Sequence, residues 1–116
     1  MSNIWTVPQP TTHMRQLCRA LGPEYIIREL DLERVIYRDF GNGYNVEISR
    51  MNTTSKRKRA SLYLWFGERI LVKSVHDVPQ DEIGERVEKL HVFSDKLVES
   101  GFDAEDLLRG HSLPDL

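Results

Sequence analysis

The sequence has very few of the residues that form disulfides and metal centres. Its single cysteine, Cys18, cannot form a disulfide within the chain, which agrees with a reducing compartment. The four histidines, His13, His76, His91 and His111, lie far apart, and the spacings H-x-x-x-H, H-E-x-x-H and C-x-x-C do not occur. We therefore expect neither a metal site nor a cofactor.

Long hydrophobic runs are also absent. No apolar stretch reaches the roughly 18 residues that a membrane-spanning helix needs, and residues 1–5 lack the composition of a signal peptide. Hydrophobic residues make up 40% of the chain and charged residues 29%, which is typical of a globular protein. With 116 residues we expect one domain, 1–116, in the cytoplasm and without a membrane partner.

Signatures of catalysis are missing as well. The segment Gly41-Asn42-Gly43 lacks the further glycine and the strand-to-helix context of a phosphate-binding loop. Cys18 falls on an apolar helix face, which indicates a buried thiol rather than a nucleophile. We predict that the protein is not an enzyme. A small enzyme remains an alternative only if folding brings His76 or His91 against a carboxylate in a pocket.

Two consecutive β-hairpins are the clearest structural signal in the chain. The first consists of residues 35–40 and 44–51 around Asn42-Gly43, the dipeptide that favours a two-residue type I′ turn. Pairing the strands across that turn sets Tyr37 opposite Ile48. The side chains then expected to point into the core are Val35, Tyr37, Tyr44, Val46 and Ile48.

The second hairpin joins residues 61–66 to residues 69–75 through Gly67-Glu68, which suits a type II′ turn. Strict alternation places Tyr63, Trp65, Ile70 and Val72 on one face of it. The other face carries Leu62, Leu64, Phe66, Leu71 and Val75. A sheet with one wet side alternates apolar and polar residues, so neither face is typical of a solvent side. We expect both faces to be covered, by helices of the chain, its N-terminal arm, a second copy or a partner.

Helices are expected at both ends of the chain. Thr11 or Thr12 can cap a helix that ends at Gly22-Pro23. Its apolar stripe is Met14, Leu17, Cys18 and Leu21. A long helix is predicted from Pro79 to Ser100, and a short one follows from Asp103 through residue 109.

The remaining segments are less regular. Residues 24–33 fit either a strand or a helix, and we favour a short edge strand. Prolines in residues 1–10 indicate an extended arm, and residues 111–116 form a tail. The predicted fold is thus α+β: an antiparallel sheet of four or five strands built from two consecutive hairpins, with an N-terminal helix, a long C-terminal helix and a short final helix.

The surplus of apolar residues on the second hairpin suggests a function in binding. We expect a non-enzymatic module that associates with a protein partner, or with a second copy of itself, through Tyr63, Trp65, Ile70 and Val72.

The alternative is an accessory protein that binds nucleic acid through its only strongly basic run, Lys56, Arg57, Lys58 and Arg59. Three acidic residues, Asp81, Glu82 and Glu85, begin the long helix, where a double-stranded RNA-binding module would need basic residues. The isoelectric point of about 6.1 also argues against a dedicated nucleic-acid binder. We therefore favour the protein partner.

Overall fold

A computed structural model describes residues 11–30, 33–52 and 58–116 of the chain, without the side chains of residues 50–52. The expected N-terminal arm and the two cations Lys56 and Arg57 lie outside this range. The elements are α1 (Thr12–Leu21), β1 (Ile26–Leu30), β2 (Glu33–Asp39), β3 (Tyr44–Asn52), β4 (Arg59–Phe66), β5 (Ile70–Pro79), η1 (Gln80–Glu82), α2 (Ile83–Glu99) and η2 (Ala104–Arg109). This confirms the predicted α+β class, and the sheet has five strands.

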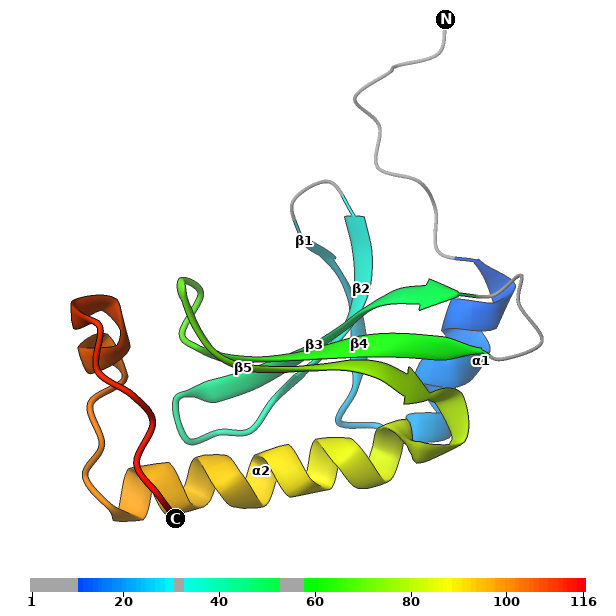
Figure 1. Ribbon diagram of the computed structural model, residues 1–116. Coiled ribbons are helices and arrows are strands. Elements are labelled where there is room, and N and C mark those ends of the chain that lie inside the picture. Colours follow the sequence, from blue (N-terminus) through cyan, green and yellow to red (C-terminus); the bar gives the residue numbers. More distant parts are fainter. Residues whose placement is uncertain (1–10, 31–32, 53–57) are drawn as a thin grey trace, which may run out of the picture.

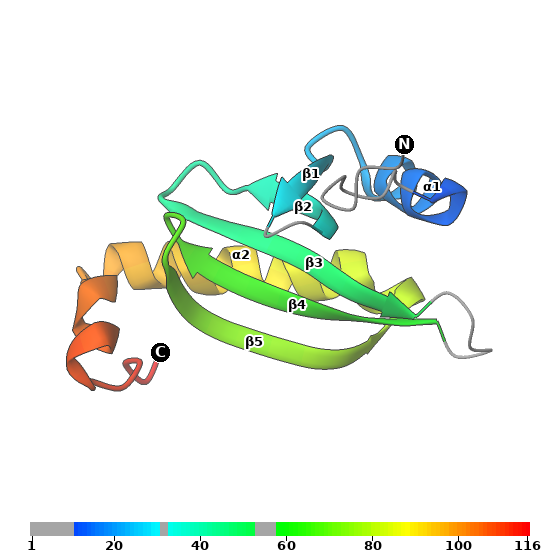
Figure 2. The same ribbon diagram turned by 90° about the horizontal axis from the view of Figure 1, so that it is seen from above.

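The strands form one antiparallel sheet in the order β1-β2-β3-β4-β5, so each strand pairs with its neighbour in sequence. Helix α2 runs along one face of the sheet, while β1 and β2 are strongly twisted relative to the other three strands (Figure 1). Seen from above, on the side of the sheet away from α2, β3, β4 and β5 lie in front of α2 (Figure 2). Within the described ranges, no helix covers this second face of β3, β4 and β5.

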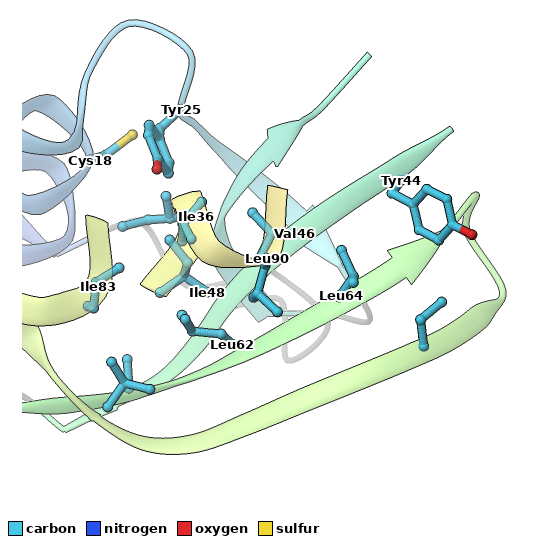
Figure 3. Packing of buried hydrophobic residues seen from close by; sticks show 14 of the residues in the cluster. Cys18, Tyr25, Ile36, Tyr44, Val46, Ile48, Leu62, Leu64, Ile83 and Leu90 are labelled. Atoms are coloured by element: carbon cyan, nitrogen blue, oxygen red, sulfur yellow. The ribbon is translucent and has the colours of Figure 1, made fainter. Parts of the chain in front are cut away.

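The hydrophobic core lies between the sheet and α2. Fully buried strand residues such as Ile36, Ile48 and Leu64 meet Ile83 and Leu90 of α2 (Figure 3). Burial of each such side chain contributes roughly 1.5–3 kcal/mol. The core therefore fixes which face of the sheet α2 covers.

The predicted register of the first hairpin is wrong by one residue. The amide of Phe40 donates to the carbonyl of Tyr44 (3.0 Å), so the loop has three residues, 41–43, instead of two. Gly41 and Gly43 have positive φ, 77° and 95°, and Asn42 does not, which excludes a type I′ turn on Asn42-Gly43. Ile48 consequently pairs with Ile36 instead of Tyr37.

This slip turns the whole of β2 over, because successive side chains of a strand point to opposite faces. Ile36 is in the core with 0% of its surface exposed. Val35 and Tyr37 point to the other face, contrary to expectation. Tyr44, Val46 and Ile48 lie in the core as predicted.

The second hairpin differs from its prediction for a similar reason. Phe66 pairs with Ile70, so this loop also has three residues, 67–69, and the type II′ turn on Gly67-Glu68 is wrong. Ile70 and Val72 therefore share the α2 face with Leu64, and both are buried in the core. The prediction that they share a face with Tyr63 and Trp65 is wrong.

Two register shifts in the β4–β5 pairing change which face of the sheet the side chains of β5 point to. They lie between the pairs of Ala60 and Leu62 and between those of Leu64 and Trp65. An extra residue in one strand reverses the alternation of side chains beyond it. Val72, Val75 and Val78 all reach the core side in consequence. The apparent excess of apolar residues on both faces of β5 is largely resolved in this way.

The ends of the helices follow the sequence signals. The side chain of Thr11 accepts a hydrogen bond from the amide of Met14 (3.1 Å) and caps α1. The amide of Phe102 donates to the carbonyl of Leu97 (3.2 Å), as in a Schellman cap at the end of α2. The strand favoured within residues 24–33 is β1, at one edge of the sheet.

Candidate functional site

The face of the sheet opposite α2, which we call the open face, is the candidate site. Its side chains follow from the strand register, because residues directly opposite each other point the same way. Glu47 of β3 lies between Tyr37 of β2 and Tyr63 of β4, and Trp65 lies opposite Leu71 of β5. Tyr37 and Tyr63 thus flank Glu47, and Trp65 lies two residues from Tyr63 on the same face of β4.

These aromatic side chains are only partly covered. Tyr37, Tyr63 and Trp65 are half-buried, and Leu71 beside Trp65 is 44% exposed. The indole nitrogen Nε1 of Trp65 is buried and has no hydrogen-bond partner in the part of the chain that the structure describes. A buried donor without an acceptor costs about 1–3 kcal/mol.

A hollow of about 310 Å³ opens on this face, and we call it the open-face hollow. Its lining comes from β1, β2, β3, β4 and the loop between β4 and β5. The lining residues are Arg28, Leu30, Val35, Tyr37, Asn45, Glu47, Trp65, Gly67, Glu68 and Arg69. The volume is at the lower end of the range for ligand sites, about 300–1,000 Å³.

Charged groups of both signs line the hollow. The guanidinium of Arg28 lies over the ring of Tyr37, 4.6 Å from its centroid, and its Nη2 is 3.5 Å from Oε1 of Glu68. Burial and the nearby Asp39 carboxylate raise the pKa of the Tyr37 phenol, which therefore stays neutral at physiological pH. Glu47 is 9% exposed and forms no ion pair with any described residue.

On the other side of the sheet, a polar cluster ties β2 to α2. Arg38 donates to Oε1 of Glu88 (2.5 Å) and lies 3.4 Å from Nδ1 of His91. The His91 ring stacks on Phe40 at 4.4 Å. Burial raises the pKa of Tyr25, whose hydroxyl also accepts from Arg38. Through these contacts His91 has a structural role, because it joins α2 to the sheet.

His76 lies at the open face beside β4. Its Nδ1 is 3.2 Å from the Oγ of Ser61, and its ring meets the edge of Tyr63. A catalytic serine needs access for a substrate, and its histidine needs an orienting group on the other ring nitrogen. Ser61 is buried, and no ion pair between His76 and a carboxylate occurs in the described ranges. The pair therefore does not form a nucleophilic site.

The basic run is partly engaged in the fold. Arg59 donates to the carbonyl of Asp77 (2.9 Å), and its Nε is 3.4 Å from Oδ1 of the same residue. Asp77 has a positive φ of 58°, which marks the bulged part of β5. Lys58 is exposed beside a depression that also contains Asp81. Of the two described cations of the run, Arg59 is therefore bound to Asp77 and Lys58 is not.

No metal-binding group emerges elsewhere in the described ranges, where no three side chains of the ligating types gather. Burial raises the pKa of the Cys18 thiol, which disfavours the thiolate that a nucleophile needs. Neither described helix has the length and apolar character to cross a membrane.

The chain is thus an α+β protein with a five-stranded antiparallel meander that carries helix α2 on one face. Comparison with known protein families, with curated proteins and with solved structures gives no match. The candidate site therefore depends on its own geometry.

The structure brings together two of the four residues predicted to bind a partner, Tyr63 and Trp65, and removes Ile70 and Val72 to the core. Sequence reasoning missed Tyr37 and Glu47 because both belong to the pairing that shifts with the first loop. The alternation of side chains between the two faces along residues 35–39 and 44–48 would have identified both residues, if the loop had been given three residues.

Proposed function

We propose that this protein is a non-catalytic binding module that associates with another protein through the open face of its sheet. The observation that carries the proposal is the cluster of Tyr37, Tyr63 and Trp65, with Leu71, on a sheet face that no described helix covers. An antiparallel sheet that faces only water would carry mainly polar side chains there. Partly exposed aromatic residues gathered on one surface mark an interaction site.

The chemistry of the open face suits a protein partner. Tyrosine, tryptophan and arginine dominate the energetic centres of protein interfaces, and all three types occur in or beside the open-face hollow. The aromatic residues stand on β2 and β4, which hydrogen bonds hold on both sides. Such a rigid surface loses little entropy on binding. We place this activity in the cytoplasm, a proposal supported by the free thiol of Cys18.

The test is site-specific photocrosslinking in cells that make the protein. A photoreactive phenylalanine analogue replaces Leu71 on the open face in one variant and Val92, exposed on α2, in a matched control. We expect a discrete crosslinked species from position 71 that is absent at position 92. Mass spectrometry of that species identifies the partner, and a crosslink to a second copy would show self-association. Crosslinks that are absent, or equal at both positions, would contradict the proposal.

Binding of single-stranded nucleic acid is the second candidate. The observation in its favour is that Tyr63 and Trp65 extend from the same strand that begins at Arg59, and aromatic residues on a sheet can stack on bases. The carboxylate of Glu47, which stands opposite Tyr63, disfavours phosphate nearby. The test is the affinity for a 20-nucleotide single strand at two salt concentrations. A salt-sensitive affinity that is lost when residues 56–59 become alanine would support this candidate.

A further inference from the structure

From the residues that line the open-face hollow, we infer that it receives an arginine side chain of the partner protein, with the guanidinium seated on Glu47 between the aromatic rings. This inference rests on the proposed function and names the chemistry that the partner must present. Charge complementarity at Glu47 carries it: this carboxylate lines the hollow and forms no ion pair with a described residue, while Arg28 of the same lining is paired with Glu68.

The side chain of Glu47 is largely covered by its neighbours. A carboxylate side chain with little surface in contact with water is readily bound by a cation that donates hydrogen bonds to it. Glu47 is 9% exposed because Tyr37 and Tyr63 stand directly on either side of it in the strand pairing. The side chain nevertheless lines the hollow, so an incoming group can reach it.

Two aromatic side chains line the hollow together with Glu47. A guanidinium is planar, stacks on aromatic faces and donates two parallel hydrogen bonds to a carboxylate. The hollow offers Tyr37 and Trp65 together with Glu47, which is the combination that such a cation requires. Arg28 already places a guanidinium over the Tyr37 ring at 4.6 Å.

The chain's own arginines at the hollow do not meet this need. Arg28 is held over Tyr37 and pairs with Glu68 at 3.5 Å. Arg69 is exposed in the loop between β4 and β5 and forms no ion pair with Glu47. A cation from outside can therefore engage Glu47 without first displacing a partner of that carboxylate among the described residues.

The experiment follows the indole N–H signal of Trp65 by NMR during titration of the full chain with small probes. The probes are N-acetylarginine methylamide, its neutral isostere N-acetylcitrulline methylamide, and N-acetylglutamate methylamide. The indole signals of Trp65 and Trp5 are assigned with Trp5→Phe. We expect the arginine probe to bind about tenfold more tightly than citrulline, because only the arginine probe can form a hydrogen-bonded charge pair with Glu47.

Variants separate Glu47 from the general charge of the protein. Glu47→Gln removes the carboxylate and should abolish the preference for arginine over citrulline, while Glu85→Gln, an equal charge change on exposed α2, should leave it intact. Tyr37→Leu tests the aromatic wall independently and should weaken binding of the arginine probe about threefold or more. Amide spectra report whether each variant keeps the fold.

Three results would overturn the inference: equal affinity for arginine and citrulline, tighter binding of the glutamate probe, or an arginine preference that survives Glu47→Gln. Tighter glutamate binding would mean that Arg28 and Arg69 govern the hollow. If the photocrosslink at position 71 forms while the arginine probe fails, the proposed function stands and only this inference fails. If both fail, the open face is not a protein-binding surface.

Discussion

The loop between β2 and β3 should contribute much of the attachment of the sheet to α2, and this can be tested at one residue. The side chain of Asn42 makes three hydrogen bonds. Its Nδ2 donates to Oγ of Ser94 (2.9 Å) and to Oδ1 of Asp95 (2.8 Å), and its Oδ1 accepts from the amide of Tyr44 (3.0 Å). Asn42→Ala removes all three.

The expected loss follows from these contacts. A neutral hydrogen bond contributes about 0.5–1.5 kcal/mol net and one to a charged group about 1.5–3 kcal/mol. The contact to Asp95 counts toward the lower end, since that side chain is about half exposed (52%). The hydroxyl of buried Ser94 keeps its hydrogen bond to the carbonyl of His91 (2.6 Å). We therefore expect Asn42→Ala to lower the free energy of unfolding by about 2.5–4.5 kcal/mol.

Urea unfolding followed by circular dichroism measures this loss. Asn45→Ala is the matched control, because Asn45 donates only one described side-chain hydrogen bond, to the exposed carbonyl of Gly67 (2.8 Å), and should cost about 1 kcal/mol or less. Asn42→Asp keeps the acceptor for Tyr44 but sets a carboxylate against Asp95, so it should cost at least as much as alanine. A loss for Asn42→Ala no larger than for Asn45→Ala would refute the reasoning.

Three further predictions test the core and the buried titrating groups. Ile36→Ala should cost about 2–5 kcal/mol in urea unfolding and Tyr37→Ala less than half as much; the reverse order would contradict the observed register. At pH 8, Cys18 should react with a disulfide reagent at least about tenfold more slowly in native than in urea-unfolded protein, because burial raises its thiol pKa and blocks access; equal rates would show an accessible thiol. Burial also raises the pKa of Tyr25 and Tyr44 above their unfolded value of about 10. The unfolded phenols lose their protons first, so the free energy of unfolding should hold below about pH 10 and fall as pH rises toward the folded pKa values; no decline by pH 11.5 would contradict this.

Much of the fold was predictable because turn and cap signals are local. Glycines in both hairpin loops, the Thr11 cap and the Gly22-Pro23 stop identified hairpins and helices from a few neighbouring residues each. Loop length was not predictable in the same way. Gly41-Asn42-Gly43 supports either two or three loop residues, and the side chain of Asn42 is bound by Ser94 of α2, 52 residues further along the chain.

The candidate site was predictable only in part, for the same reason. Tyr63 and Trp65 share a face in any regular strand, so their grouping needed no knowledge of the partner strand. The places of Ile70, Leu71 and Val72 depended on a loop one residue longer and on irregular pairing, which are properties of two strands together. Glu47 became a site residue only once β2 and β4 brought a tyrosine to each side of it.

The irregular pairing of β5 also affects how copies of this protein can associate through the edge of the sheet. A long strand at the rim of a sheet offers unpaired backbone groups that can recruit another chain and start a fibril. In β5 the two register shifts, the left-handed Asp77 and the terminal Pro79 interrupt that row. A strand of another molecule therefore has no long regular edge with which to pair. At high protein concentration we expect contacts between side chains rather than a β-sheet that extends from one molecule to the next.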